Sequence, residues 1–168
     1  MGRVAMIVVV HAHPYPSTSR AGAALLEGIR GIPGLEIRSL CDLYPDFDID
    51  VAAEQAALER ATRVAFMHPL YWYTVPAILK HWMDTVLVPG WAHGPGGTRL
   101  AGKECLWIAT ASDEEAYGES PIPLVERVAV ACGMKWLEPF VVRDTHQLSG
   151  EALRQAGREL RARLEPRD

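Results

Sequence analysis

A short segment after the first apolar run concentrates side chains that can bind a phosphate. Residues 4–10 are apolar and largely β-branched, and residues 11–22 then supply hydroxyls, imidazoles and a guanidinium. If a helix begins near Ser19, its unpaired backbone N–H groups and its dipole favour an anion there. The candidate phosphate donors are the hydroxyls of Ser17, Thr18 and Ser19, together with His13 and Arg20. Such a segment suits a monophosphate such as that of FMN.

Two other interpretations of this segment stay open on the residues alone. Ser19 could do no more than cap the helix, with His13 a solvated loop residue. His11 and His13 have a spacing that two metal ligands could use, but no further His or Asp follows in the loop, so we predict no metal. The G-x-G-x-x-G pattern is absent, so we do not expect a nicotinamide to bind in the Rossmann manner.

The second candidate region is an aromatic run that follows the apolar residues 64–67. On the surface, three consecutive aromatic side chains would expose a large apolar patch unless a flat aromatic ligand or another subunit covered it. The alternative is that they plug the end of a sheet as ordinary core. On the first interpretation the covered side chains are those of Tyr71, Trp72 and Tyr73.

Both regions need a scaffold that brings strand ends together, and the chain alternates strand-like and helix-like segments. We expect strands at residues 4–10, 35–40, 64–67, 104–110 and 135–142. We expect helices at about residues 19–30, 51–61, 75–86, 122–132 and 149–164. Strands joined by helical crossovers predict a parallel sheet with helices on both faces. The expected fold is an α/β, flavodoxin-like three-layer sandwich, with a five-stranded sheet of order 2-1-3-4-5 and its ligand between strands 1 and 3.

Composition places the chain among ordinary globular proteins. Its 168 residues suit a single domain, 1–168, and the net charge of -4 argues against a nucleic-acid partner. Three scattered cysteines form no disulfide framework, which favours a reducing cytoplasm. Cys105 and Cys132 lie in apolar runs and are expected in the core. No apolar run reaches the length of a membrane span.

Several motifs together resemble those of the flavodoxin-like NAD(P)H:quinone oxidoreductases. They are His13-Pro14 with Ser19, Pro69-Leu70-Tyr71-Trp72-Tyr73-x-x-Pro76-x-x-x-Lys80-x-x-x-Asp84, Gly90-Trp91-Ala92-His93-Gly94-Pro95-Gly96-Gly97 and Leu100-x-Gly102-Lys103. Two further stretches resemble the ancillary subunit of glutathione-gated potassium-efflux antiporters. They are Tyr44-Pro45-Asp46-Phe47-x-Ile49-Asp50-x-Ala52-Ala53-Glu54-Gln55 and Trp136-Leu137-x-Pro139-Phe140. The resemblance covers nearly the whole chain.

This resemblance implies a bound FMN or FAD, NAD(P)H as co-substrate, a quinone acceptor, ping-pong hydride transfer and a homodimer with the active site at its interface. Carried over to this sequence, the resemblance places the phosphate at His13, Ser19, Arg20, Ala21 and Gly22, and the ring at Pro69, Leu70, Tyr71, Trp72 and Tyr73. It adds a third cofactor-binding segment after the fourth strand, Thr110, Ala111, Ser112 and Asp113. The family usually has Thr-Gly-Gly there, so this sequence lacks the glycines that allow close backbone approach to the ring. The residues that the resemblance places near the substrate are Tyr117 and His93.

Two other functions are compatible with the same residues. The chain could be a regulatory subunit of a potassium-efflux antiporter, cytoplasmic and peripheral at the inner face of the membrane, with or without enzyme activity. It could also be a one-electron carrier like flavodoxin. The segment after the first strand lacks the dense Ser, Thr and Gly pattern of that family and the charge is modest, so the oxidoreductase is the preferred prediction.

Overall fold

The sheet has the strand order that the sequence predicts, with one additional strand. The computed structural model describes residues 5–112 and 124–165 of the chain. Its strands pair in the order β2-β1-β3-β4-β5, all in parallel, and β6 also pairs with β4. The strands are β1 (Ile7–His11), β2 (Leu35–Ser39), β3 (Arg63–Pro69), β4 (Glu104–Thr110), β5 (Lys135–Trp136) and β6 (Phe140–Val142).

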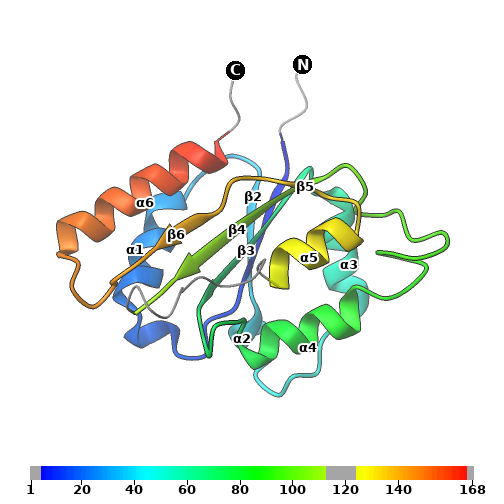
Figure 1. The fold of residues 1–168 in the computed structure, drawn as a ribbon, viewed down its shortest axis with the longest axis horizontal. Coiled ribbons are helices and arrows are strands. Elements are labelled where there is room, and N and C mark those ends of the chain that lie inside the picture. The colour runs from blue at the N-terminus through cyan, green and yellow to red at the C-terminus, as the bar shows by residue number, and fades with distance from the viewer. Residues whose placement is uncertain (1–4, 113–123, 166–168) are drawn as a thin grey trace.

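Helices cover both faces of the sheet, which makes three layers (Figure 1). α1 and α6 lie on one face, and α3, α4 and α5 lie on the other. The helices are η1 (Pro16–Thr18, a 3₁₀ turn), α1 (Arg20–Ile29), α2 (Leu40–Leu43), α3 (Val51–Arg60), α4 (Ala77–Val86), α5 (Leu124–Ala131) and α6 (Gly150–Leu164). Among the described helices, none has both the length and the apolar character that crossing a membrane requires.

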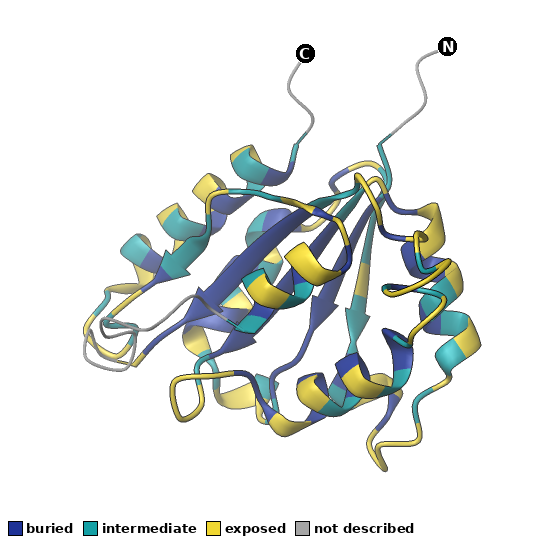
Figure 2. Cartoon of the chain, turned by 45° about the vertical axis from the view of Figure 1, so that its right-hand side comes forward, coloured by how far each residue is buried: buried dark blue, intermediate teal, exposed yellow. Residues whose placement is uncertain are grey.

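The central strands are buried on both faces, as their unbroken apolar runs predict (Figure 2). Side chains alternate across a strand, so Ile7 and Val9 join the core under α1 and α6, whereas Val8 and Val10 join the core under α3, α4 and α5. Cys105 and Cys132 are both buried in the second of these cores, which confirms their expected place.

The expected strand at residues 135–142 is wrong as a single element, because the structure divides it into β5 and β6. Pro139 lies in the gap and has no N–H to donate to the ladder. Cys105 of β4 pairs with Trp136 of β5, and Ile108 of β4 pairs with Phe140 of β6. Between these two pairs β4 advances by three residues, whereas the edge chain advances by four. One extra residue is therefore accommodated as in a β-bulge, and the chain then resumes pairing toward the carboxyl end of β4.

Smaller differences concern where elements begin and end. β3 continues through Pro69, which pairs with Thr110, so His68 and Pro69 belong to the strand and not to the loop after it. α4 begins one residue after Pro76, which serves as its N-cap. The short helix α2 was not expected. Because β3 ends at Pro69, the aromatic run that begins at Tyr71 follows the strand after a single residue.

The position of α1 depends on a close approach to α6. The two helices meet at Gly28 and Gly157, and a Cβ atom on Gly157 would lie 2.6 Å from the carbonyl oxygen of Ala24. The absence of side chains at this crossing lets the backbones touch. The N-terminal end of α1, where the phosphate is expected, is thereby held against a rigid layer.

Candidate functional site

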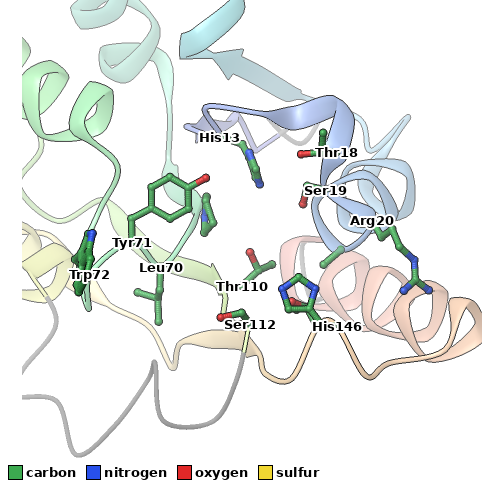
Figure 3. Close-up of a pocket in the computed structure, with 13 residues that line it drawn as sticks. His13, Thr18, Ser19, Arg20, Leu70, Tyr71, Trp72, Thr110, Ser112 and His146 are labelled. Atoms are coloured by element: carbon green, nitrogen blue, oxygen red, sulfur yellow. The ribbon is translucent and has the colours of Figure 1, made fainter.

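One cavity opens at the carboxyl edge of the sheet, and its walls come from the segments that follow β1, β3, β4 and β6. Its volume is ≈ 570 Å³. The lining residues are His13, Thr18, Ser19, Arg20, Ala21, Pro69, Leu70, Tyr71, Trp72, Thr110, Ser112, Thr145 and His146. Figure 3 shows Leu70, Tyr71 and Trp72 at one end and Thr18, Ser19 and His146 at the other. The cavity therefore has an aromatic end and a polar end.

Ser19 shapes the polar end by starting α1. Its Oγ accepts a hydrogen bond from the backbone N–H of Gly22 at 2.9 Å, so Ser19 is the N-cap of the helix and also lines the cavity. A Cβ atom on Gly22 would lie 2.8 Å from that Oγ, so glycine lets the cap form. Gly22 does not itself line the cavity, whereas Ala21 does.

His13 is a buried residue, so the interpretation of it as a solvated loop residue is wrong. Only 9% of it is exposed, and its Nδ1 accepts a hydrogen bond from the backbone N–H of Tyr15 at 3.0 Å. The neutral ring must then carry its proton on Nε2. Burial lowers the pKa of His13, which favours this neutral form. In Figure 3 the ring extends into the cavity between its two ends. His13 can therefore donate one hydrogen bond to a ligand.

Arg20 takes an unexpected direction. It lines the cavity, but its guanidinium donates a hydrogen bond to the backbone carbonyl oxygen of Leu148 at 3.3 Å. Figure 3 shows the side chain extending away from the cavity toward α6. Its backbone N–H lies in the first turn of α1, where no intrahelical acceptor exists. Arg20 therefore contributes its backbone to the polar end, and its charge lies elsewhere.

The aromatic end is built on a tight turn. Tyr71 and Thr74 exchange two backbone hydrogen bonds of 3.1 and 3.0 Å, and between them Trp72 has φ 48° and Tyr73 has φ 64°. Two consecutive positive φ angles are typical of a type I′ turn, which normally selects Asn and Gly. For bulky residues this backbone costs about 1–3 kcal/mol per residue. Local preference opposes this turn, which points to a functional reason for it.

The exposure of these aromatics excludes their role as an ordinary core plug. Trp72 is 91% exposed and Tyr73 is 66% exposed, while Tyr71 is 37% exposed. Tyr71 and Trp72 line the cavity, and Tyr73 does not. The turn thus presents an apolar surface to solvent, as expected if a ligand or another subunit covers it.

A buried histidine supports the strand end beneath this turn. His68 is 1% exposed, its Nε2 accepts from the indole N–H of Trp107 at 2.8 Å, and its Nδ1 lies 2.8 Å from the carbonyl oxygen of Pro69. Nδ1 must donate to that carbonyl, so both partners require the neutral ring. Burial lowers the pKa of His68 to about 4. The Pro69 peptide, which leads into the turn, is fixed by this side chain.

The remaining predicted residues do not all lie at this cavity. Thr110 and Ser112 line the cavity beside the end of β4, and Ala111 is buried. His93 lines a separate cavity of ≈ 300 Å³ beside α4 and α5, so it does not reach the first cavity within its own chain. Asp113 and Tyr117 lie outside the described residues. Lys103, from the Leu100-x-Gly102-Lys103 motif, donates to the carbonyl oxygen of Glu59 at 2.9 Å near the end of α3, a structural role.

Thr145 and His146 also line the cavity, and neither was predicted from the sequence. They follow β6 as the other lining segments follow their strands. The signal that could have found them is the rule that ligands bind beyond the carboxyl ends of parallel strands. Within the described residues, no group of three or more His, Cys, Asp or Glu side chains could hold a metal ion.

The buried His68 should make stability depend on pH. Its pKa of about 4 in the folded chain lies below the value near 6.5 of an unfolded histidine, so the unfolded state binds the proton first as pH falls. Wild type should therefore lose stability between about pH 6.5 and pH 4. His68→Gln removes this contribution, which is about 3 kcal/mol at most, and should make the profile less steep; burial also lowers the pKa of His11 to about 4, so a slope from His11 remains in both proteins. Urea unfolding from pH 7 to pH 4 measures both proteins. If the free energy of unfolding falls equally steeply with pH in both proteins, His68 is not a source of the pH dependence.

The strained turn should tolerate glycine at Tyr73 and not at Tyr71, two residues earlier. Tyr73→Gly relieves the positive φ and removes an exposed side chain, so we expect the free energy of unfolding to rise by about 1 kcal/mol. Tyr71→Gly is the matched control, because Tyr71 is not among the residues with positive φ and glycine there should lower stability. Denaturant titration compares the two. If both lose stability equally, the turn is not strained.

Comparison with known proteins agrees with this geometry. Residues 5–164 match the family described as having a flavodoxin-like fold. The ancillary protein KefF of the glutathione-regulated potassium-efflux system of Klebsiella pneumoniae is 47% identical over 167 residues, covering 95% of this chain and 94% of that protein. A general stress protein 14 from Treponema denticola, solved in complex with FMN, has a TM-score of 0.83 at 28% identity, covering 95% of this chain and 97% of that one. An NADPH-quinone reductase from P. pentosaceus has a TM-score of 0.78 at 24% identity, covering 94% of this chain and 96% of that one. The chain belongs to the flavodoxin-like family that includes the KefF ancillary proteins.

Proposed function

We propose that the chain is a flavin-dependent oxidoreductase that transfers two electrons from NAD(P)H to a quinone by a ping-pong mechanism. The observation that carries this proposal is the cavity at the switch point between β1 and β3, polar at the start of α1 and aromatic at the Tyr71–Trp72 turn. A ligand that is flat at one end and anionic at the other matches it. A relative that was solved with FMN and a structural neighbour that is a quinone reductase support the choice.

The residues present fit FMN at both ends. At the polar end, the backbone N–H groups of Arg20 and Ala21, the Ser19 hydroxyl and Nε2–H of His13 are donors for a phosphate. At the other end, Leu70 and Tyr71 offer an apolar wall to the ring. When bound, FMN supplies the hydride-transfer chemistry between a nicotinamide and a quinone. The protein orients it and shields one side from water. FAD would use the same polar end for its first phosphate.

A homodimer is part of this proposal. The cavity opens beside Trp72 and Tyr73, whose exposed rings would be covered by a second copy of the chain. His93 lies off the cavity of its own chain, so any role in catalysis requires it to reach the cavity of the partner. Tyr117 keeps its predicted role as a donor near the ring and the substrate. Substrates would then bind between the two subunits.

The spectrum of the reconstituted protein tests the enzyme. Purified protein incubated with FMN and desalted should retain the visible flavin absorption, lose it on addition of NADPH or NADH, and regain it on addition of a simple quinone. Tyr71→Ala removes part of the ring wall and should lower flavin retention several-fold. Tyr15→Ala is the control, because Tyr15 is 66% exposed and does not line the cavity. A protein that retains FMN but is reduced by neither nicotinamide would contradict the proposal.

A second function is favoured by the 47% identity to a KefF ancillary protein over nearly the whole of both chains. On this proposal the chain is cytoplasmic, binds peripherally at the inner face of the membrane, and regulates a potassium-efflux protein. Efflux would be measured in cells that carry the antiporter, with and without this chain. Efflux that rises with wild type and with a flavin-free variant alike would assign regulation without enzyme activity. Unchanged efflux with wild type would contradict the regulatory function.

A further inference from the structure

The segment 143–148, which follows β6, closes the polar end of the cavity. It is held by backbone and side-chain hydrogen bonds on both sides: Thr145 N–H donates to the carbonyl oxygen of Ala111 at 3.1 Å, and Arg20 donates to that of Leu148 at 3.3 Å. Within it, Gln147 N–H donates to the carbonyl oxygen of Asp144 at 2.8 Å, which closes a turn around His146. The loop is therefore tied to both β4 and α1, and it carries His146 into the cavity wall.

A phosphate at the polar end needs donors that face it from more than one side. Among the lining residues that the structure describes, those able to carry positive charge are His13, Arg20 and His146. The guanidinium of Arg20 is turned toward Leu148, and burial favours the neutral form of His13. His146 is exposed, and Figure 3 shows its ring standing below Ser19, beside Thr110 and Ser112. Its position is across the polar end from the start of α1.

The geometry points to His146 as a ligand of the FMN phosphate, with Arg20 as a positioning residue that fixes the loop carrying His146. This inference rests on the proposed flavin site. It adds a wall to the phosphate end of that site, opposite α1 and separate from the aromatic turn. The phosphate is then enclosed by α1 on one side and by an imidazole from the end of the sheet on the other. Hydrogen bonds to a charged group are stronger than those to a neutral one, so His146 should discriminate for the phosphate.

The experiment compares two flavins that share the ring and differ in the phosphate. Dissociation constants of FMN and riboflavin are measured by quenching of flavin fluorescence for wild type, His146→Ala and Gln147→Ala. His146→Ala should weaken FMN binding about tenfold to a hundredfold and leave riboflavin binding unchanged. Gln147→Ala is the matched control, since Gln147 is exposed on the same loop, does not line the cavity, and uses its backbone for the turn.

The outcomes separate this inference from the function on which it rests. Wild type that binds neither flavin overturns the proposed function and this inference with it. Wild type that binds FMN, with His146→Ala binding it equally tightly, overturns the inference alone. Equal weakening of FMN and riboflavin by His146→Ala would show that the residue holds the fold of the loop, which also overturns it.

The role of Arg20 is tested by a double-mutant cycle. If Arg20 acts only by fixing the loop, Arg20→Ala should weaken FMN binding in the wild-type background and add nothing in the His146→Ala background. If its guanidinium contacts the phosphate directly, the two effects should add. Riboflavin binding should be unaffected in each variant. Additive losses would overturn the assignment of Arg20 as a positioning residue.

Discussion

The last hydrogen bonds of the parallel ladder link every loop that forms the cavity. Ala12 N–H donates to the carbonyl oxygen of Met67 at 2.9 Å, and Leu70 N–H donates to that of Thr110 at 2.8 Å. On the other side of β4, Ala111 N–H donates to the carbonyl oxygen of Val142 at 2.9 Å. Each loop therefore leaves the sheet from a point fixed by its neighbour. Because these bonds align the carboxyl ends of neighbouring strands, the distance between the polar and aromatic ends of the cavity is fixed by the sheet.

A buried carboxylate stabilises the face opposite α1 and α6. Glu54 of α3 is 1% exposed and accepts hydrogen bonds from the Tyr44 hydroxyl at 2.6 Å, the Trp82 indole at 3.0 Å and the Arg38 Nε at 3.0 Å. Burial and the hydrogen bond to Glu54 raise the pKa of Tyr44 to about 12, so its hydroxyl stays a donor. Removal of one partner from a buried charge typically costs about 3–5 kcal/mol. This cluster joins β2, α3 and α4, and α4 begins where the aromatic turn ends.

The order of the strands and the two ends of the cavity follow from short-range signals in the sequence. Unbroken apolar runs identify buried strands, and Ser19 marks the start of α1 because it can cap it. The left-handed turn at Trp72 and Tyr73 could not be predicted, since the intrinsic preference of bulky residues opposes it. The direction of the Arg20 side chain depends on Leu148, which is remote in sequence. Thr145 and His146 were missed although the expected last strand ends at Val142, as β6 does, because a ligand predicted between strands 1 and 3 does not by itself indicate the loop after the edge strand.

The bulge at Pro139 also affects when the cavity can exist during synthesis of the chain. By adding one residue between β5 and β6 it lets the edge strand run on to the carboxyl end of β4, so the final wall is contributed by residues 145 and 146, which follow all the other lining residues in the sequence. The opposite wall starts at His13. A nascent chain on the ribosome therefore exposes the aromatic turn before the wall that faces it has emerged. On the proposed function, the flavin site is therefore complete only after residues 145 and 146 have folded into place beside the end of β4.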